Sequence, residues 1–181
     1  MSEEMLRLSF ALSAFLAVTA VDTDGRSWTL FAPAAHELDL LFFVATDCPI
    51  SNRYAPEIAR ICADYRSKGV RCFLVYPDAG LDGAAVSAHR HEYGLTATPA
   101  IVDRDHRLVR AAGPRVTPEA ALYSSSGRVY RGRIDDWYVD VGRSRRQATQ
   151  HDLRLRIEAA LPGRSIAPAE TEAVGCFIAN P

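Results

Sequence analysis

The chain has 181 residues, the length of one ordinary domain, and 48% of them are hydrophobic while 24% are charged. This composition is typical of a folded globular protein and argues against a disordered, collagen-like or coiled-coil chain. The net charge of −1 gives no global positive field, so neither nucleic acid nor an anionic membrane is an expected partner. Four irregularly spaced cysteines without a CxxC pair argue against a disulfide-stapled mini-protein and a zinc site.

The first twenty residues allow two interpretations. Met5–Ala20 has one positive charge, an apolar stretch and small residues at its end, as in a short export signal, although Glu3 and Glu4 precede it. Phe15–Val21 also predicts a strand that turns through Asp-Thr-Asp-Gly into a second strand, Ser27–Phe31. An exported or periplasmic location and a cytoplasmic one therefore both stay open. We expect no transmembrane segment, because no other apolar run is long enough.

The next part of the chain has the pattern of a β-α-β unit. Leu38–Thr46 is almost continuously apolar, as in a strand covered on both faces. Ser51–Ser67 has helical periodicity, and Lys68-Gly69 ends it with a basic last turn followed by glycine. Val70–Tyr76 is a second buried strand, and the intervening helix predicts that the two strands run parallel.

Shorter elements fill the second half of the chain. We expect a helix over Ala84–Tyr93, a strand over Ala100–Val102, a helix over His106–Ala112, a hairpin of Ala120–Tyr123 and Arg128–Arg131, an irregular stretch Gly132–Ser144, and a helix over Arg145–Leu161. This order predicts an α/β sandwich with a mixed central sheet. The expected organisation is one domain over residues 15–162, after a signal-like or disordered stretch 1–14 and before an irregular tail, 163–181.

Cys48 is the first candidate for chemistry. It lies at the turn between a buried strand and a helix, where the amides of the helix N-terminus point. Their unpaired N–H groups and the helix dipole favour thiolate over thiol, which predicts a lowered pKa and a nucleophilic sulfur. The Ser51 hydroxyl can point back toward the same sulfur. Pro56 lies inside the helix, where it removes a backbone hydrogen bond and bends the axis.

These features resemble the thioredoxin fold, and more narrowly its redoxin branch, which includes the AhpC/TSA-like and cytochrome-maturation-like proteins. Cys48-Pro49-Ile50-Ser51 stands where the family keeps its CxxC motif, Pro56 at its helix-kink proline, and Thr117-Pro118 at its cis-proline. The segment between Asp78 and Gly113 resembles the strand-and-helix insertion of the redoxin branch. The resemblance covers residues 15–178.

The resemblance implies thiol–disulfide exchange or thiol-dependent peroxide reduction. Cys48 would be the nucleophile, with the helix amides and Ser51 stabilising its thiolate. A cis bond between Thr117 and Pro118 would bring the Thr117 backbone beside the sulfur, where it could pair with an extended substrate. The implied partners are a protein or small-molecule disulfide or a peroxide, and an external thiol reductant. No metal or organic cofactor is required.

Four positions depart from the family pattern. Ser51 replaces the second cysteine, so the motif can form a mixed disulfide but cannot resolve it locally. Ala45 and Leu41 stand where the peroxiredoxin branch has Thr or Ser and Pro, which argues against peroxide activation by that motif. Asp47 replaces an aromatic residue; its charge would raise the thiol pKa, whereas Arg53 would lower it.

The other cysteines leave an alternative function open. Cys62, on the apolar face of its helix, and Cys72, in a buried strand, are expected in the core. Cys176 has three possible roles: it resolves the Cys48 intermediate, forms a static disulfide with Cys48, or only packs. The alternative to an enzyme is therefore a non-catalytic binding or accessory module with an idle or permanently oxidised Cys48.

Histidines and charged clusters are expected to be structural or exposed. His89 and His91 point to different faces of a helix, which predicts exposure rather than a chelating pair, and His106 should be at the surface. A copper-delivery site of the Sco type is disfavoured because Asn52 occupies its second cysteine position. The remaining candidates predict a solvated face, Asp135-Asp136 with Arg143, Arg145 and Arg146, and loop anchors, Trp137 and Tyr138.

Overall fold

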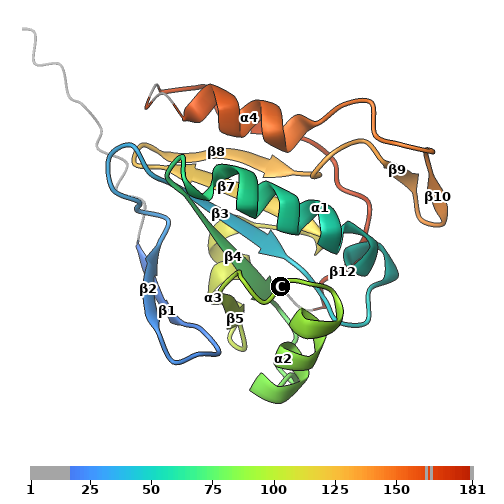
Figure 1. Cartoon of the computed structure of the whole chain (residues 1–181). Coiled ribbons are helices and arrows are strands. Elements are labelled where there is room, and N and C mark those ends of the chain that lie inside the picture. Colours follow the sequence, from blue (N-terminus) through green and yellow to red (C-terminus); the bar gives the residue numbers. More distant parts are fainter. Residues whose placement is uncertain (1–16, 162, 164, 180–181) are drawn as a thin grey trace, which may run out of the picture.

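The computed structural model describes residues 17–161, 163 and 165–179 (Figure 1). The strands of its main sheet are β3 (Leu38–Phe43), β4 (Val70–Tyr76), β5 (Ala100–Val102), β7 (Glu119–Ser124), β8 (Gly127–Gly132) and β11 (Ala169–Glu170). They follow the spatial order β11-β8-β7-β3-β4-β5. β3 runs parallel to β4 and antiparallel to β7, so the sheet is mixed, as expected.

The two faces of the sheet support separate apolar cores. Every residue of β3 is buried, and alternate side chains enter opposite cores. Leu40 and Phe42 share one core with α1 (Pro49–Arg66), α2 (Gly83–Glu92) and α4 (Asp152–Ala160). Leu41 and Phe43 share the other with α3 (Arg107–Ala112) and the hairpin of β1 (Val18–Val21) and β2 (Ser27–Leu30). Figure 1 shows α1 and α4 side by side above the sheet.

Helix α1 begins two residues earlier than the periodicity predicts. Cys48 is its N-cap and Pro49 occupies the first turn, where a missing N–H costs nothing. Pro56 lies inside the helix, as expected. The helix ends at Arg66, and Gly69 turns the chain into β4 with a φ of 88°, a left-handed conformation that favours glycine.

The segment before α4 corrects two predictions. The helix begins at Asp152 rather than Arg145, and Asp135 and Asp136 are buried rather than on a solvated face. Burial disfavours a charged Asp136, but hydrogen bonds from Thr149 and Gln150 hold the pKa of its carboxyl well below the usual range. These bonds tie residues 149 and 150 to the buried carboxylate, where they cannot join the helix. Part of the stretch expected to be irregular also forms a hairpin of β9 (Tyr138–Asp140) and β10 (Arg143–Ser144).

The two ends of the chain carry further strands. Val18–Val21 forms β1, which confirms the hairpin interpretation for these residues; most of the possible export signal lies outside the described residues. The tail, expected to be irregular, contributes β11 and also β12 (Cys176–Phe177). β12 pairs antiparallel with β6 (Val116–Thr117), the short strand that precedes Pro118. The tail therefore returns to the N-terminus of α1.

Candidate functional site

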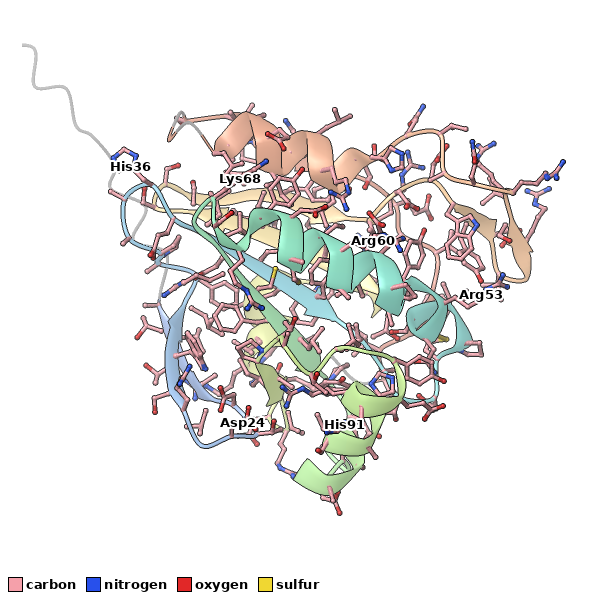
Figure 2. All side chains as sticks on the ribbon, viewed as in Figure 1. Asp24, His36, Arg53, Arg60, Lys68 and His91 are labelled. Carbon is pink, nitrogen blue, oxygen red and sulfur yellow. A yellow bond between two sulfur atoms is a disulfide. The ribbon has the colours of Figure 1, made fainter. Side chains whose placement is uncertain are left out.

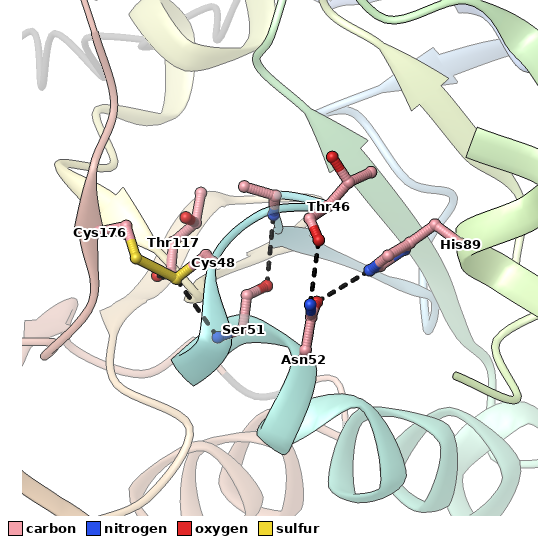
Figure 3. Close-up of a disulfide and its surroundings, with 8 residues drawn as sticks. Thr46, Cys48, Ser51, Asn52, His89, Thr117 and Cys176 are labelled. Atoms are coloured by element: carbon pink, nitrogen blue, oxygen red, sulfur yellow. Dashed lines mark hydrogen bonds between the residues drawn. A yellow bond between two sulfur atoms is a disulfide. The ribbon is translucent and has the colours of Figure 1, made fainter. Parts of the chain in front are cut away.

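A disulfide joins Cys48 to Cys176 across 128 positions of sequence (Figure 3). Cys48 is only 1% exposed, whereas Cys176 on β12 is partly exposed. The Cα atoms of the two cysteines are 6.0 Å apart. The bond agrees with a resolving role or a static disulfide for Cys176, and it excludes the role in which Cys176 only packs.

Two backbone groups contact the Cys48 sulfur, one a hydrogen-bond donor and the other a hydrogen-bond acceptor. The Ser51 N–H donates to Sγ over 3.4 Å, and the Thr117 carbonyl oxygen lies 3.0 Å from Sγ. After reduction, the amide and the helix N-terminus stabilise a thiolate, whereas the carbonyl accepts the proton of a thiol. The site therefore offers a hydrogen-bonding group to either protonation state of the sulfur.

The peptide bond between Thr117 and Pro118 is cis, as the resemblance implies. Thr117 is 2% exposed, and its register partner in the neighbouring strand is Cys176. The Thr117 backbone consequently lies beside both sulfurs of the disulfide. The three residues that the sequence nominated here, Cys48, Thr117 and Cys176, are brought together.

Ser51 acts on the sulfur through its backbone amide. Its Oγ accepts a hydrogen bond from the Ala45 N–H over 3.3 Å instead of pointing to Sγ as expected (Figure 3). This bond fastens the loop between β3 and α1 to the first turn of the helix. Ser51 therefore positions the loop that carries Cys48.

A buried polar chain that the sequence analysis missed holds the other side of this loop (Figure 3). Asn52 Nδ2 donates to the Thr46 carbonyl over 3.0 Å, and Asn52 Oδ1 lies 2.9 Å from His89 Nε2. Tyr76 Oη lies 2.9 Å from His89 Nδ1. His89 is 6% exposed, so the predicted exposure is wrong for it, whereas His91 is exposed (Figure 2). The spacing of Val86 and His89 on α2, both buried, is the signal that could have found it.

The donors and acceptors of this chain fix the histidine tautomer. Because Asn52 uses its amide to donate, its oxygen must accept from a protonated Nε2 of His89. Nδ1 is then the acceptor for the Tyr76 hydroxyl. Burial lowers the pKa of His89, which favours this neutral form. A neutral His89 thus connects α2 to the first turn of α1.

Aromatic residues enclose the outer side of α1. Tyr54 Oη donates to Asp135 over 2.6 Å, and the same carboxylate accepts the Trp137 N–H. Burial, followed by the Asp135 carboxylate, raises the pKa of Tyr54. The Arg53 guanidinium lies 5.3 Å from the centre of the Trp137 ring (Figure 2). Trp137 anchors the 136–145 loop as expected, since its indole N–H donates to the Arg145 carbonyl.

The remaining two cysteines are free thiols, of which Cys62 is buried and Cys72 is partly buried. Cys62 is 3% exposed on α1, and Cys72 on β4 packs against the same core. Burial, reinforced by a hydrogen bond with Cys62, raises the pKa of the Cys72 thiol. Cys62 therefore has the core surroundings that the sequence predicts, whereas Cys72 is less buried than expected, and the surroundings of Cys72 do not favour a thiolate.

A hollow of about 400 Å³ borders the disulfide on its open side. Its walls include Asp47, His106, Cys176 and Phe177. In the part of the chain that the structure describes, no three His, Cys, Asp or Glu side chains are grouped so that they could hold a metal ion. Within the same residues, no helix combines the length and apolar character needed to cross a membrane.

Neither a protein-family model nor a curated protein matches the sequence. The structure is similar to that of a hypothetical protein from Sinorhizobium meliloti, with 24% identity, a TM-score of 0.74 and 91% of both chains covered. An uncharacterized conserved protein from Geobacillus kaustophilus has 20% identity and a TM-score of 0.77, with 91% of this chain and 88% of that chain covered.

Similar structures also include thioredoxin-like thiol–disulfide oxidoreductases. One is a secreted Mycobacterium tuberculosis disulfide oxidoreductase homologous to Escherichia coli DsbE, with 18% identity and a TM-score of 0.55 over 79% of this chain and 96% of that one. At these identities the similarity establishes the fold. The chain has a thioredoxin-like fold, and a disulfide joins Cys48 to Cys176 within it.

Proposed function

We propose that this chain is a thiol–disulfide oxidoreductase of the redoxin branch, with Cys48 and Cys176 as its redox pair. The observation that carries the proposal is the disulfide between a helix N-cap cysteine and a tail cysteine paired with Thr117. The motif lacks its second cysteine because Ser51 stands there. Cys176 supplies the missing thiol from the other end of the chain.

The reduced protein would start the exchange with Cys48. Its thiolate attacks one sulfur of a substrate disulfide, a sulfur–sulfur bond forms, and the second substrate sulfur leaves as a thiolate that takes a proton from water. The Cys176 thiolate then attacks the Cys48 sulfur and releases the first substrate sulfur. Two electrons pass to the substrate, which becomes a dithiol, while the protein becomes the disulfide. Ser51 N–H and the α1 N-terminus stabilise the Cys48 thiolate.

Regeneration by an external thiol would begin at the other sulfur. Cys176 borders the 400 Å³ hollow, whereas Cys48 is 1% exposed, so an incoming thiolate reaches Cys176 first. Cys48 is also the better leaving group because the helix N-terminus stabilises its thiolate. The reductant forms a mixed disulfide with Cys176, and a second reductant thiol resolves it. Both cysteines then carry thiols.

Peroxide reduction of the AhpC/TSA type is the weaker activity for this site. Ala45 is a small apolar residue at the position where that branch activates peroxide, and its N–H is occupied by Ser51 Oγ. We therefore expect peroxide to be consumed no faster than by a free thiol.

Thiol trapping with mass spectrometry tests the proposal. The native protein is alkylated before and after exposure to glutathione or a dithiol, with Cys62 and Cys72 as internal controls. We expect the Cys48–Cys176 bond to be reduced in the folded protein and to re-form when a disulfide-bonded protein is added. With Cys176→Ser, a mixed disulfide on Cys48 should accumulate; with Cys48→Ser it should not. A bond that resists both reductants until the protein unfolds would establish the non-catalytic module instead.

A further inference from the structure

The resemblance implies that an extended substrate peptide pairs with the Thr117 edge of β6. On the basis of the proposed function, we infer that the chain's own tail displays the amino-acid pattern that this edge selects in a cysteine-bearing substrate peptide. The chain's own tail, residues 175–178, occupies this site as an internal copy of such a peptide. The sequence of the tail then defines the substrate class. The preferred pattern is glycine, cysteine, any residue, and an apolar residue.

The tail has the geometry of a bound substrate strand. Cys176 lies opposite Thr117 and Phe177 opposite Val116 in an antiparallel pair. The Ile178 N–H extends the pairing by donating to the Arg115 carbonyl over 3.0 Å. Such main-chain pairing, together with a disulfide to the nucleophile, is what an exchange intermediate with an extended peptide requires.

The residue before the cysteine must be glycine in this register. A Cβ added to Gly175 would lie 2.2 Å from the Thr117 carbonyl oxygen and 2.7 Å from its carbon. These are backbone atoms of the strand that also contacts the Cys48 sulfur, so a side chain there pushes the peptide away from the nucleophile. The site therefore selects against any larger residue at this position.

The two residues after the cysteine have opposite surroundings. Phe177 is 89% exposed, so the first position after the cysteine contributes no selection. Ile178 is 8% exposed and belongs to the apolar core that also contains Leu108 and Phe43. Burial of the side chain at this position favours an aliphatic residue and disfavours a charged one. The first position after the cysteine is therefore unselective, and the second selects an apolar side chain.

Activated peptides test this pattern on the full-length Cys176→Ser protein, whose Cys48 is free. Each peptide carries a chromogenic aromatic disulfide on its cysteine, and the released thiolate reports the rate of mixed-disulfide formation. We expect a Gly-Cys-Phe-Ile peptide to react about tenfold faster than Val-Cys-Phe-Ile or Gly-Cys-Phe-Asp. Gly-Cys-Ser-Ile should stay within about twofold of the first peptide.

The same substitution should change the rate of mixed-disulfide formation in opposite directions when it is made in the tail and when it is made in the peptide. In the Cys176→Ser background, Ile178→Asp weakens the competing tail, so the Gly-Cys-Phe-Ile peptide should react several-fold faster, whereas Asp in the peptide slows it. Equal rates for all peptides, with no effect of Ile178→Asp, would overturn the inference while leaving the proposed function standing. If Cys48 reacts with none of the peptides and not with the small aromatic disulfide either, the proposed function fails as well.

Discussion

Helix α1 carries two cysteines in contrasting chemical settings. Cys48 is the N-cap, receives a hydrogen bond from the Ser51 amide and is joined to a tail residue 128 positions away. Cys62 lies four turns along the same helix, faces the core and has the Cys72 thiol as its polar neighbour. Both sulfurs are almost fully buried, so burial does not separate their chemistry. Position along the helix does, because only the N-terminus offers unpaired amides.

The largest expected effect separates these two cysteines directly. Cys48→Ser should reduce disulfide exchange to the uncatalysed background, because none of the other three cysteines is the N-cap of a described helix. The matched Cys62→Ala variant should retain activity within about twofold, since it alters only core packing. Initial rates of reduction of a disulfide-bonded protein check both. Loss of activity in Cys62→Ala, with the fold intact by circular dichroism, would place the second pair in the reaction.

The next effect concerns the free energy of unfolding, which should differ between the disulfide-bonded pair of cysteines and the free pair, Cys62 and Cys72. Closing a loop of 128 residues restricts the unfolded chain, so Cys176→Ser should lower the free energy of unfolding by about 2–5 kcal/mol. Cys72→Ala should cost only about 1 kcal/mol because Cys72 is only partly buried and closes no loop. Denaturant unfolding under oxidising conditions measures both. Under reducing conditions the wild type should approach Cys176→Ser, and a difference that persists there would show that the serine, not the missing bond, is the cause.

A third test concerns what holds the Cys48 end of α1. Asn52→Ala removes the bond to the Thr46 carbonyl and leaves His89 Nε2–H without its acceptor. We expect a loss of about 1–3 kcal/mol in the free energy of unfolding. Reduced Cys48 should also be alkylated more slowly, because the freed loop no longer holds its sulfur against the Ser51 amide that stabilises the thiolate. Alkylation of Cys72 should not change. The control His91→Ala, on the exposed part of α2, should alter neither quantity.

The features of the site that are set by neighbouring residues in the sequence could be predicted. The apolar run of β3, the helical period of α1 and the cysteine between them identify a strand, a helix and an N-cap without knowledge of distant residues. Thr117 and Pro118 could be placed beside Cys48 only through the resemblance. The same resemblance left Cys176 with three roles, because a tail cysteine has no periodicity that fixes its partner.

Several of the features that sequence reasoning missed depend on long-range pairing. β6 and β12 have two residues each, too few for an alternating pattern, and their pairing joins positions 59 apart. His89 is buried only because Asn52 and Tyr76, from two other elements, satisfy both ring nitrogens. Asp136 delays the start of α4 by binding residues that the helical period includes. Each case is a polar group whose partner is remote in sequence.

The smallest expected effect is the pH dependence that His89 gives to stability. Burial lowers its pKa in the folded protein, so below about pH 6.5 the unfolded chain takes up a proton that the folded chain refuses. The free energy of unfolding should therefore fall with decreasing pH, by at most about 1.4 kcal/mol per pH unit, until the folded pKa is reached. Above pH 6.5 both states are neutral and the contribution is complete.

Denaturant unfolding of wild type and His89→Gln between pH 5 and 8 isolates this slope. The difference between the two proteins should shrink as the pH falls. A constant difference for His89→Gln would mean that the Tyr76–His89 contact tolerates a proton on Nδ1, and protonation of His89 would then not weaken the connection between α2 and the N-terminus of α1.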